Sequence, residues 1–97
     1  YRPVNIAIVD DGGDLVLFRR QNNSFLLSIA IAITKANSSA GIPAPTRTIQ
    51  DIVYGKDDKP GRVPGLAHSK NIVAFPGGLP IKTKNGMLLG AIGVSGA

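Results

Sequence analysis

The feature that most constrains the fold is an Asn-Gly pair near the end of the chain, followed by an apolar run with a glycine at every third position. Asn85-Gly86 is a strong signal for a tight hairpin turn, and residues 87–94 follow it as an apolar strand. A glycine inside a strand marks a place where another backbone approaches closely. We therefore predict a buried strand that packs at Gly90 and Gly93 against a helix or a neighbouring subunit.

The length of the chain fits one domain near the lower limit for a self-sufficient core, since it has 97 residues of which 43% are hydrophobic. A strand as apolar as residues 87–94 normally continues into a loop and a covering element, but the chain stops at Ala97. We therefore expect residues 1–97 to be a single, truncated domain.

Composition excludes several classes of protein. With no cysteine and a single histidine, the chain cannot build a structural zinc site or a multi-histidine metal cage by itself. A net charge of +5 favours a small anionic ligand. The cations are scattered and aromatic residues are few, so we expect no nucleic-acid partner. The longest apolar stretch, residues 25–33, is too short to span a bilayer, so we expect a soluble, cytoplasmic protein with no membrane partner, although secretion stays open.

The pattern of apolar runs predicts an α/β (α+β) fold with a five-stranded antiparallel sheet and helices. The first strand is apolar on both faces, which predicts that the sheet is covered on both sides. Turn residues from Asp10 onward join it to the second strand as a hairpin. The predicted strands cover residues 4–9, 15–19, 71–75, 79–82 and 87–94, and the predicted helices cover residues 25–37 and 46–53.

The first predicted helix is apolar around most of its circumference. Ser28 and Lys35 lie seven positions apart and share one face, whereas leucine, isoleucine and alanine occupy the other faces. Such a helix needs more cover than one sheet provides, so we expect either further helices or a second subunit, and we predict a homo-oligomer. Between the second helix and the third strand, residues 54–69 form a long polar loop that is a candidate wall of a binding site.

Several motifs in this chain resemble those of the GlcG/HbpS-like haem-binding protein family, which includes the C-terminal domain of PduO-type proteins. The resemblance covers nearly all of residues 1–97. The motifs are Val9-Asp10 with Gly13, Leu15-Val16 with Phe18 and Arg20, Ala32 with Lys35-Ala36, Pro45-Thr46-Arg47, and, most specific, Pro76-Gly77-Gly78-Leu79-Pro80 followed by Gly90-Ala91-Ile92-Gly93-Val94-Ser95-Gly96.

The resemblance implies a profilin-like sandwich that assembles as dimers and often as higher oligomers such as octamers. It also implies haem or corrinoid binding in some members. The chain departs from the family pattern in lacking a helix before the first strand and another after the last glycine motif, which agrees with truncation at both ends. It also carries Asn22 where the family has an aspartate.

Five side chains are candidate ligand-binding residues. His68 could serve as an axial haem ligand, since a neutral imidazole offers a lone pair to iron, and Tyr54 is an alternative. The cations Arg20, Lys35 and Arg47 could meet carboxylates such as haem propionates. The competing interpretations are a solvated loop histidine and, for Lys35, a cation near a helix C-terminus.

The glycine motifs do not predict a nucleotide site, because a phosphate loop follows a strand and opens a helix. Gly77 and Gly78 lie between two predicted strands, whereas Gly90, Gly93 and Gly96 lie within or after the last one. Backbone geometry explains them better, through a positive φ in the turn and close packing along the strand.

The sequence leaves three functions open. The first is an oligomeric module that binds haem, a corrinoid or another anionic planar ligand. The second is a small-molecule enzyme of isomerase or lyase type on the same scaffold, in which Asp10 and Lys35 would polarise a carbonyl or move a proton. Asp10 is an equally good hairpin-turn residue, so nothing in the spacing demands catalysis. The third is a purely structural assembly subunit.

Overall fold

The computed structural model describes residues 2–96 as a small α+β fold with a four-stranded antiparallel sheet in the order β2-β1-β4-β3. The pairing of β1 with β2 and that of β3 with β4 each shift register near one end, with the extra residue in β2 in the first pair and in β4 in the second. The elements in chain order are β1 (Asn5–Asp10), β2 (Leu15–Arg20), the helix α1 (Leu27–Gly41), the helix α2 (Thr46–Tyr54), the 3-10 helix η1 (Pro64–His68), β3 (Gly78–Lys82) and β4 (Leu88–Ser95).

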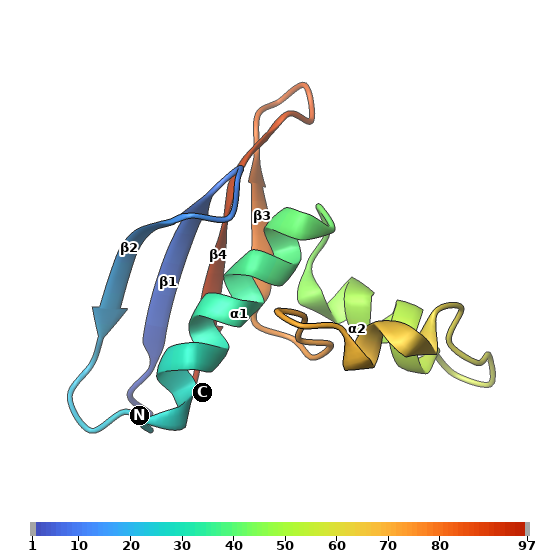
Figure 1. Cartoon of the computed structure of the whole chain (residues 1–97), viewed down its shortest axis with the longest axis horizontal. Coiled ribbons are helices and arrows are strands. Elements are labelled where there is room, and N and C mark those ends of the chain that lie inside the picture. Colours follow the sequence, from blue (N-terminus) through green and yellow to red (C-terminus); the bar gives the residue numbers. More distant parts are fainter. Residues whose placement is uncertain (1, 97) are drawn as a thin grey trace.

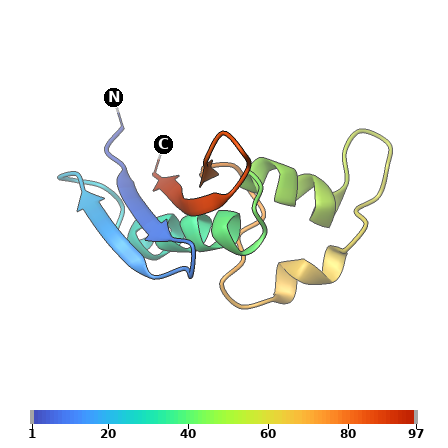
Figure 2. The same ribbon diagram turned by 90° about the horizontal axis from the view of Figure 1, so that it is seen from above.

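The helix α1 lies along one face of the sheet, and α2 and η1 project together to one side of it (Figure 1). We call residues 46–68, which carry α2 and η1, the arm. Seen from above, the opposite face of the sheet has no helix over it within the described part of the chain (Figure 2). No helix among residues 2–96 is long and apolar enough to cross a membrane.

The contact between α1 and the sheet is built from small residues rather than large ones. Ala32 and Ala36 of α1 are fully buried and pack with Ala7 and Ala91 of the central strands. The leucines at the start of the helix, by contrast, point to solvent, with Leu27 73% exposed. A helix that lies this close to a sheet has room only for small side chains on its inner face, which explains why its bulky apolar residues remain on other faces.

Large apolar side chains line the sheet face that α1 does not cover. Ile8 of β1 is paired with Leu17 of β2 on one side and with Ile92 of β4 on the other, and Ile92 is paired with Leu79 of β3. Paired residues share a face, so these four side chains form one apolar row across the whole sheet. Leu17 is 52% exposed, and the predicted cover on both faces of the first strand is not present among residues 2–96.

The arm has a small apolar core of its own. Ile49 and Val53 of α2 are almost completely buried, and they pack with Ala74, Leu66 and Ile72. This cluster is separate from the cluster between α1 and the sheet. The protein is therefore one sheet-and-helix body with a second, smaller packing unit beside it.

Two buried hydroxyl groups connect the arm to the body. The Ser38 Oγ atom on α1 accepts a hydrogen bond from the Val73 N–H at 2.9 Å, after the chain returns from the arm. The Thr46 Oγ1 atom at the start of α2 accepts from the Gly78 N–H at 2.8 Å, where β3 begins. Both hydroxyls are shielded from solvent, so these bonds hold the arm at its base.

The prediction of five strands was wrong, because residues 71–75 form no strand. Asn71 has a left-handed φ of 62°, which breaks an extended run at its first residue. The Val73 N–H bonds to the Ser38 side chain instead of a neighbouring strand, and Ile72 packs into the arm. A short apolar run looks the same in a sequence whether a sheet or a helical cluster buries it.

We predict that Gly93→Val unfolds or severely destabilises the protein, by at least about 3 kcal/mol. A Cβ atom built on Gly93 would overlap the Ala32 carbonyl oxygen and lie 2.6 Å from the Ala36 nitrogen, and both are helix backbone atoms that cannot move independently. Urea unfolding followed by circular dichroism measures the effect. Gly41→Ala is the matched control, because nothing lies within 4 Å of its Cβ position, and it should change stability by less than about 1 kcal/mol. Equal stability of both variants would contradict this account of the helix–sheet contact.

Candidate functional site

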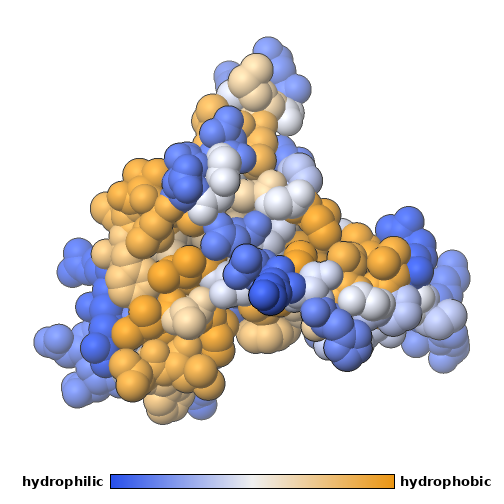
Figure 3. Space-filling view, viewed as in Figure 1, coloured by the Kyte–Doolittle hydropathy of each residue, from blue (hydrophilic) through white to orange (hydrophobic). Residues whose placement is uncertain are grey.

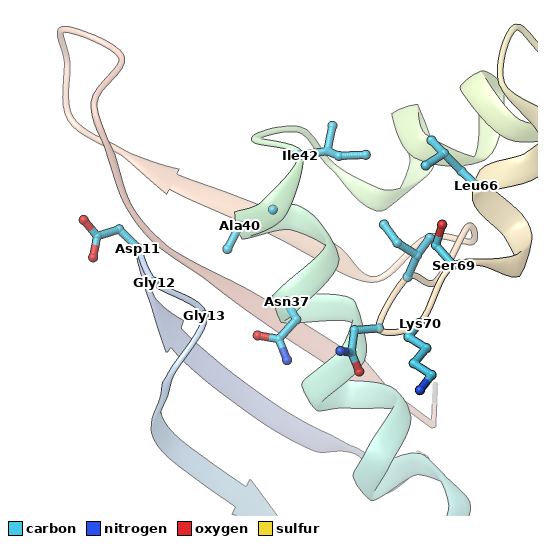
Figure 4. A pocket seen from close by; sticks show the side chains of 12 residues that line it. Asp11, Gly12, Gly13, Asn37, Ala40, Ile42, Leu66, Ser69 and Lys70 are labelled. Carbon is cyan, nitrogen blue, oxygen red and sulfur yellow. The ribbon is translucent and has the colours of Figure 1, made fainter.

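A cavity with a volume of about 550 Å³ lies between the β1–β2 turn, the C-terminal end of α1 and the segment that follows η1 (Figure 4). We call it the cleft. Its walls come from three separate parts of the chain, which only the fold brings together. The lining residues are Asp11, Gly12, Gly13, Asn37, Ala40, Gly41, Ile42, Leu66, Ser69, Lys70, Asn71 and Ile72.

The cleft has an apolar side and a polar side with charges of both signs. Ile42, Leu66 and Ile72 belong to the apolar cluster of the arm and line the cleft where the arm meets the body. Asp11 and Lys70 are exposed charged residues on opposite sides of the cleft, and the Asp11 carboxylate points away from Asn37 (Figure 4). Such a cleft suits a ligand with an apolar body and a polar edge.

One buried polar atom at the cleft lacks a partner. The Asn37 Oδ1 atom is buried and makes no hydrogen bond within residues 2–96. Gly13 has a φ of 85°, which favours glycine at this position in the turn, and a Cβ atom there would lie 3.2 Å from this oxygen, a tight contact. Buried polar atoms are nearly always hydrogen-bonded, so a donor such as a water molecule is expected at Asn37.

Asp10 has a structural task in the hairpin turn. Its Oδ1 atom accepts hydrogen bonds from the Gly12 and Asp14 N–H groups, both at 2.9 Å. It does not face Lys35, because Asp10 pairs with Gly90 whereas the Lys35 amine bonds to Val94. Those two positions are four residues apart along β4, or about 13 Å. The structure therefore does not bring together the two residues named for the enzyme alternative.

Lys35 lies inside the protein, with only 7% of the residue exposed. Its Nζ atom donates a hydrogen bond to the Val94 carbonyl oxygen at 2.9 Å and lies 5.1 Å from the centre of the Phe75 ring. No carboxylate pairs with it within the described residues. Burial lowers the pKa of the Lys35 amine from its ordinary value, because the charged form loses its hydration.

The glycines of the two motifs make room for Lys35 and its helix. A Cβ atom on Gly77, whose φ is 131°, would lie 2.5 Å from the Lys35 Nζ atom. A Cβ atom on Gly78 would lie 2.6 Å from the Lys35 carbonyl oxygen, and one on Gly93 would lie 3.0 Å from the Lys35 Cβ atom. Gly90 and Gly96 meet the backbone of the first strand and of the segment before it. The three positions around Lys35 are therefore glycine for the same reason, which is that a side chain at any of them would come too close to Lys35.

The other predicted ligand-binding residues are spread over the molecule. Arg20, at the end of β2, reaches the Ser24 Oγ atom at 3.4 Å. Arg47 is exposed in the first turn of α2, and Tyr54 is the last residue of the same helix, 65% exposed. His68 is exposed at the end of η1, directly before the cleft residue Ser69. The structure does not gather these residues into one site, and of them only His68 adjoins the cleft in sequence.

Sequence reasoning missed most of the cleft. The predicted site wall was the loop over residues 54–69, whereas the cleft uses residues 66 and 69–72. Asn37 and Lys70 are not part of any motif, and the sequence predicts Asp11 and Gly13 as residues of the hairpin turn. The sequence signal that points to the cleft is weak. Polar residues occur in the hairpin turn and near the end of the first helix, and a long polar loop follows later in the chain.

A four-stranded antiparallel sheet with one covering helix and a cleft beside it defines a small α+β domain with a ligand-sized cavity. The chain belongs to the family described as "Haem degrading protein HbpS-like", because the sequence model of that family matches residues 1–97. The resemblance found in the glycine motifs is thus confirmed over the whole length.

Relatives from bacteria support this assignment. The chain is 36% identical over 94 residues to an uncharacterized 15.0 kDa protein in the dhaT-dhaS intergenic region of Citrobacter freundii, and the match covers 97% of this chain and 64% of that protein. The chain therefore spans less than two thirds of this relative's length.

Solved structures share the fold. Klebsiella pneumoniae protein ORFY has a TM-score of 0.81 and 31% identity, covering 99% of this chain and 64% of that one. A double mutant of Streptomyces reticuli HbpS has a TM-score of 0.86 and 27% identity, covering 99% and 60%. PduOC, solved as a haem complex, has a TM-score of 0.80 and 28% identity, covering 99% and 67%.

We predict that Lys35 makes the stability of the protein rise with pH. Above the lowered pKa the folded protein carries a neutral amine, whereas the unfolded chain stays protonated up to the ordinary value of 10.5. The unfolded state then binds more protons, so the free energy of unfolding increases with pH in that window. Urea unfolding at several alkaline pH values should show this rise in the wild type relative to Lys35→Met.

The matched control is Lys84→Met, which removes an exposed lysine from the turn between β3 and β4 and should keep the rise. A wild type and a Lys35→Met variant with parallel pH profiles would show that the amine is not buried as described.

Proposed function

We propose that this protein is a haem-binding module and that the cleft holds the ligand. The observation that carries the proposal is the position of the single histidine, His68, which lies in the chain between the cleft residues Leu66 and Ser69. Membership of the HbpS-like family and the likeness to PduOC, solved as a haem complex, support the choice of haem.

The residues around the cleft fit such a ligand in three respects. Its volume of about 550 Å³ is within the usual range of 300–1,000 Å³ for small-molecule sites. The apolar side chains of Ile42, Leu66 and Ile72 suit a macrocycle, and Lys70 suits a propionate. His68 would supply an imidazole ligand to the iron. The side with Asp11 and Asn37 offers acceptors and is unsuited to a carboxylate, so we place the propionates toward Lys70.

We predict that haem titrated into the protein gives a saturable Soret shift and that His68→Ala removes or strongly moves it. Loss of an imidazole ligand changes the coordination of the iron and hence its absorbance. Visible absorbance measures both. Tyr54→Phe is the matched control, because it removes the alternative oxygen ligand at the far end of α2 while keeping the ring.

The outcomes of this experiment distinguish between His68 and Tyr54 as the residue that binds the iron. A shift lost only in Tyr54→Phe would assign the iron to Tyr54. A shift unchanged in both variants would contradict a ligand role for either residue, and no shift in the wild type would contradict haem binding. A corrinoid titrated in parallel tests the other ligand implied by the family resemblance.

We also propose that the protein self-associates through the outer surface of α1. Leu26 and Leu27 are 74% and 73% exposed at the start of the helix, beside Phe25 at 71%. Hydrophobic side chains gather over this half of the helix (Figure 3). No charged residue occurs between Arg20 and Lys35, so copies of this surface meet without an ionic penalty.

We predict that the double substitution Leu26→Gln with Leu27→Gln weakens self-association by at least about tenfold, since it removes apolar area from the centre of the contact. Sedimentation equilibrium measures the change. Val63→Gln is the matched control, because Val63 is an exposed apolar residue at 47% on the arm, away from α1. A wild type that is monomeric at high concentration would exclude the proposed assembly.

A further inference from the structure

We propose that Lys35 is a positioning residue: by holding the turn over residues 75–77 against α1 and β4, it fixes the adjoining wall of the cleft. The consequence for the cleft rests on the proposed function, whereas the hold on the turn does not. Two contacts of this side chain and one backbone hydrogen bond beside them support the proposal.

The first two contacts are polar. The Lys35 Nζ atom bonds to the Val94 carbonyl oxygen at 2.9 Å, and the Val94 N–H group donates to the Gly77 carbonyl oxygen at 2.8 Å. The backbone of Val94 is thus held by the lysine on one side and by the turn on the other. The amine, the strand and the turn form one connected hydrogen-bonded group.

The third contact is with the ring of Phe75. The Nζ atom lies 5.1 Å from the ring centre, within the range of a cation–π interaction. Phe75 is 45% exposed, so its position is not fixed by burial in the core. Because Gly77 leaves no side chain in the way, the turn closes directly over the end of the lysine.

The turn and the cleft wall are parts of one continuous segment. Residues 69–72 line the cleft, and residues 75–77 follow after two buried residues. At the other end, Ser38 binds the segment through the Val73 N–H group. Ser38 and Lys35 are neighbours on α1, so the helix holds this return segment at two points and Lys35 supplies the second.

The protonation state of Lys35 should change the stability of the closed turn over residues 75–77. Among the described residues of α1, β3, β4 and the return segment, no ionised group pairs with the amine, so desolvation lowers its pKa, while the contact with the Phe75 ring opposes this shift. If the turn opens, the amine regains water. Opening is therefore favoured while the amine is protonated, and the turn closes more firmly as the pH rises.

Amide hydrogen exchange measured by NMR at several pH values tests the proposal in the ligand-free protein. After correction for the intrinsic rate, the Val94 amide should become at least threefold more protected as Lys35 deprotonates, with the midpoint read from the Lys35 Cε resonance. The Ala7 amide, in the middle of the sheet, should not change. In Lys35→Met the pH dependence should vanish, and in the exposed control Lys84→Met it should persist.

Two substitutions of Phe75 separate positioning from simple packing. Phe75→Leu removes the ring that stabilises the charge, so the Lys35 midpoint should fall, and Phe75→Trp should restore or raise it. Phe75 is half exposed, so both variants should fold. If the protection of the Val94 amide does not change with pH in the wild type, or if the change persists in Lys35→Met, the proposal that Lys35 holds the turn is wrong.

The link to the cleft has its own readouts. Lys35→Met should alter exchange at the Val73 amide and lower haem affinity by at least threefold. Unchanged Val73 exchange in that variant overturns the link. If the wild type binds no haem, the proposed function fails while the exchange results still decide the role of Lys35.

Discussion

The close approach of one helix to the central strands is the constraint on which the rest of the structure depends. The backbone of α1 lies against β4 at Gly93, where any side chain would overlap the helix. Only alanine, serine and one extended lysine fit on the inner face of the helix. This explains a helix that buries its small and polar residues and leaves leucines outside, the reverse of the usual amphipathic pattern.

Much of the body could be predicted from sequence because local signals agreed there. The hairpin at Asp10, the helix and the glycine-rich strand each have a pattern that only one structure satisfies, and the antiparallel arrangement follows from short connections. The family was also identifiable, because the Pro76–Pro80 and Gly90–Gly96 motifs have a fixed order and spacing. Those glycines are informative because backbone atoms, rather than side chains, contact them.

The arm and the cleft could not be predicted in the same way, because both depend on contacts between distant residues. The segment over residues 71–75 has the composition of a strand, yet the Ser38 hydroxyl takes one of its backbone bonds. Asn37 and Lys70 line one cleft from segments 33 positions apart, and neither residue is itself part of a motif. The predicted cations Arg20, Lys35 and Arg47 do not converge on one site. Their chemistry favours anion binding, but only the fold determines where each of them lies.

The bulge in β2 and the proline in β3 have a consequence for how this sheet can grow. The outer strand β2 has one extra residue where its pairing with β1 shifts register, and the other outer strand, β3, contains Pro80, which has no N–H group to donate. A strand arriving from another molecule would find an irregular row of donors and acceptors at either border. Fibre-like extension of the sheet is therefore disfavoured, and any partner has to approach through a broad surface, where side chains rather than main-chain pairing decide which partner is accepted.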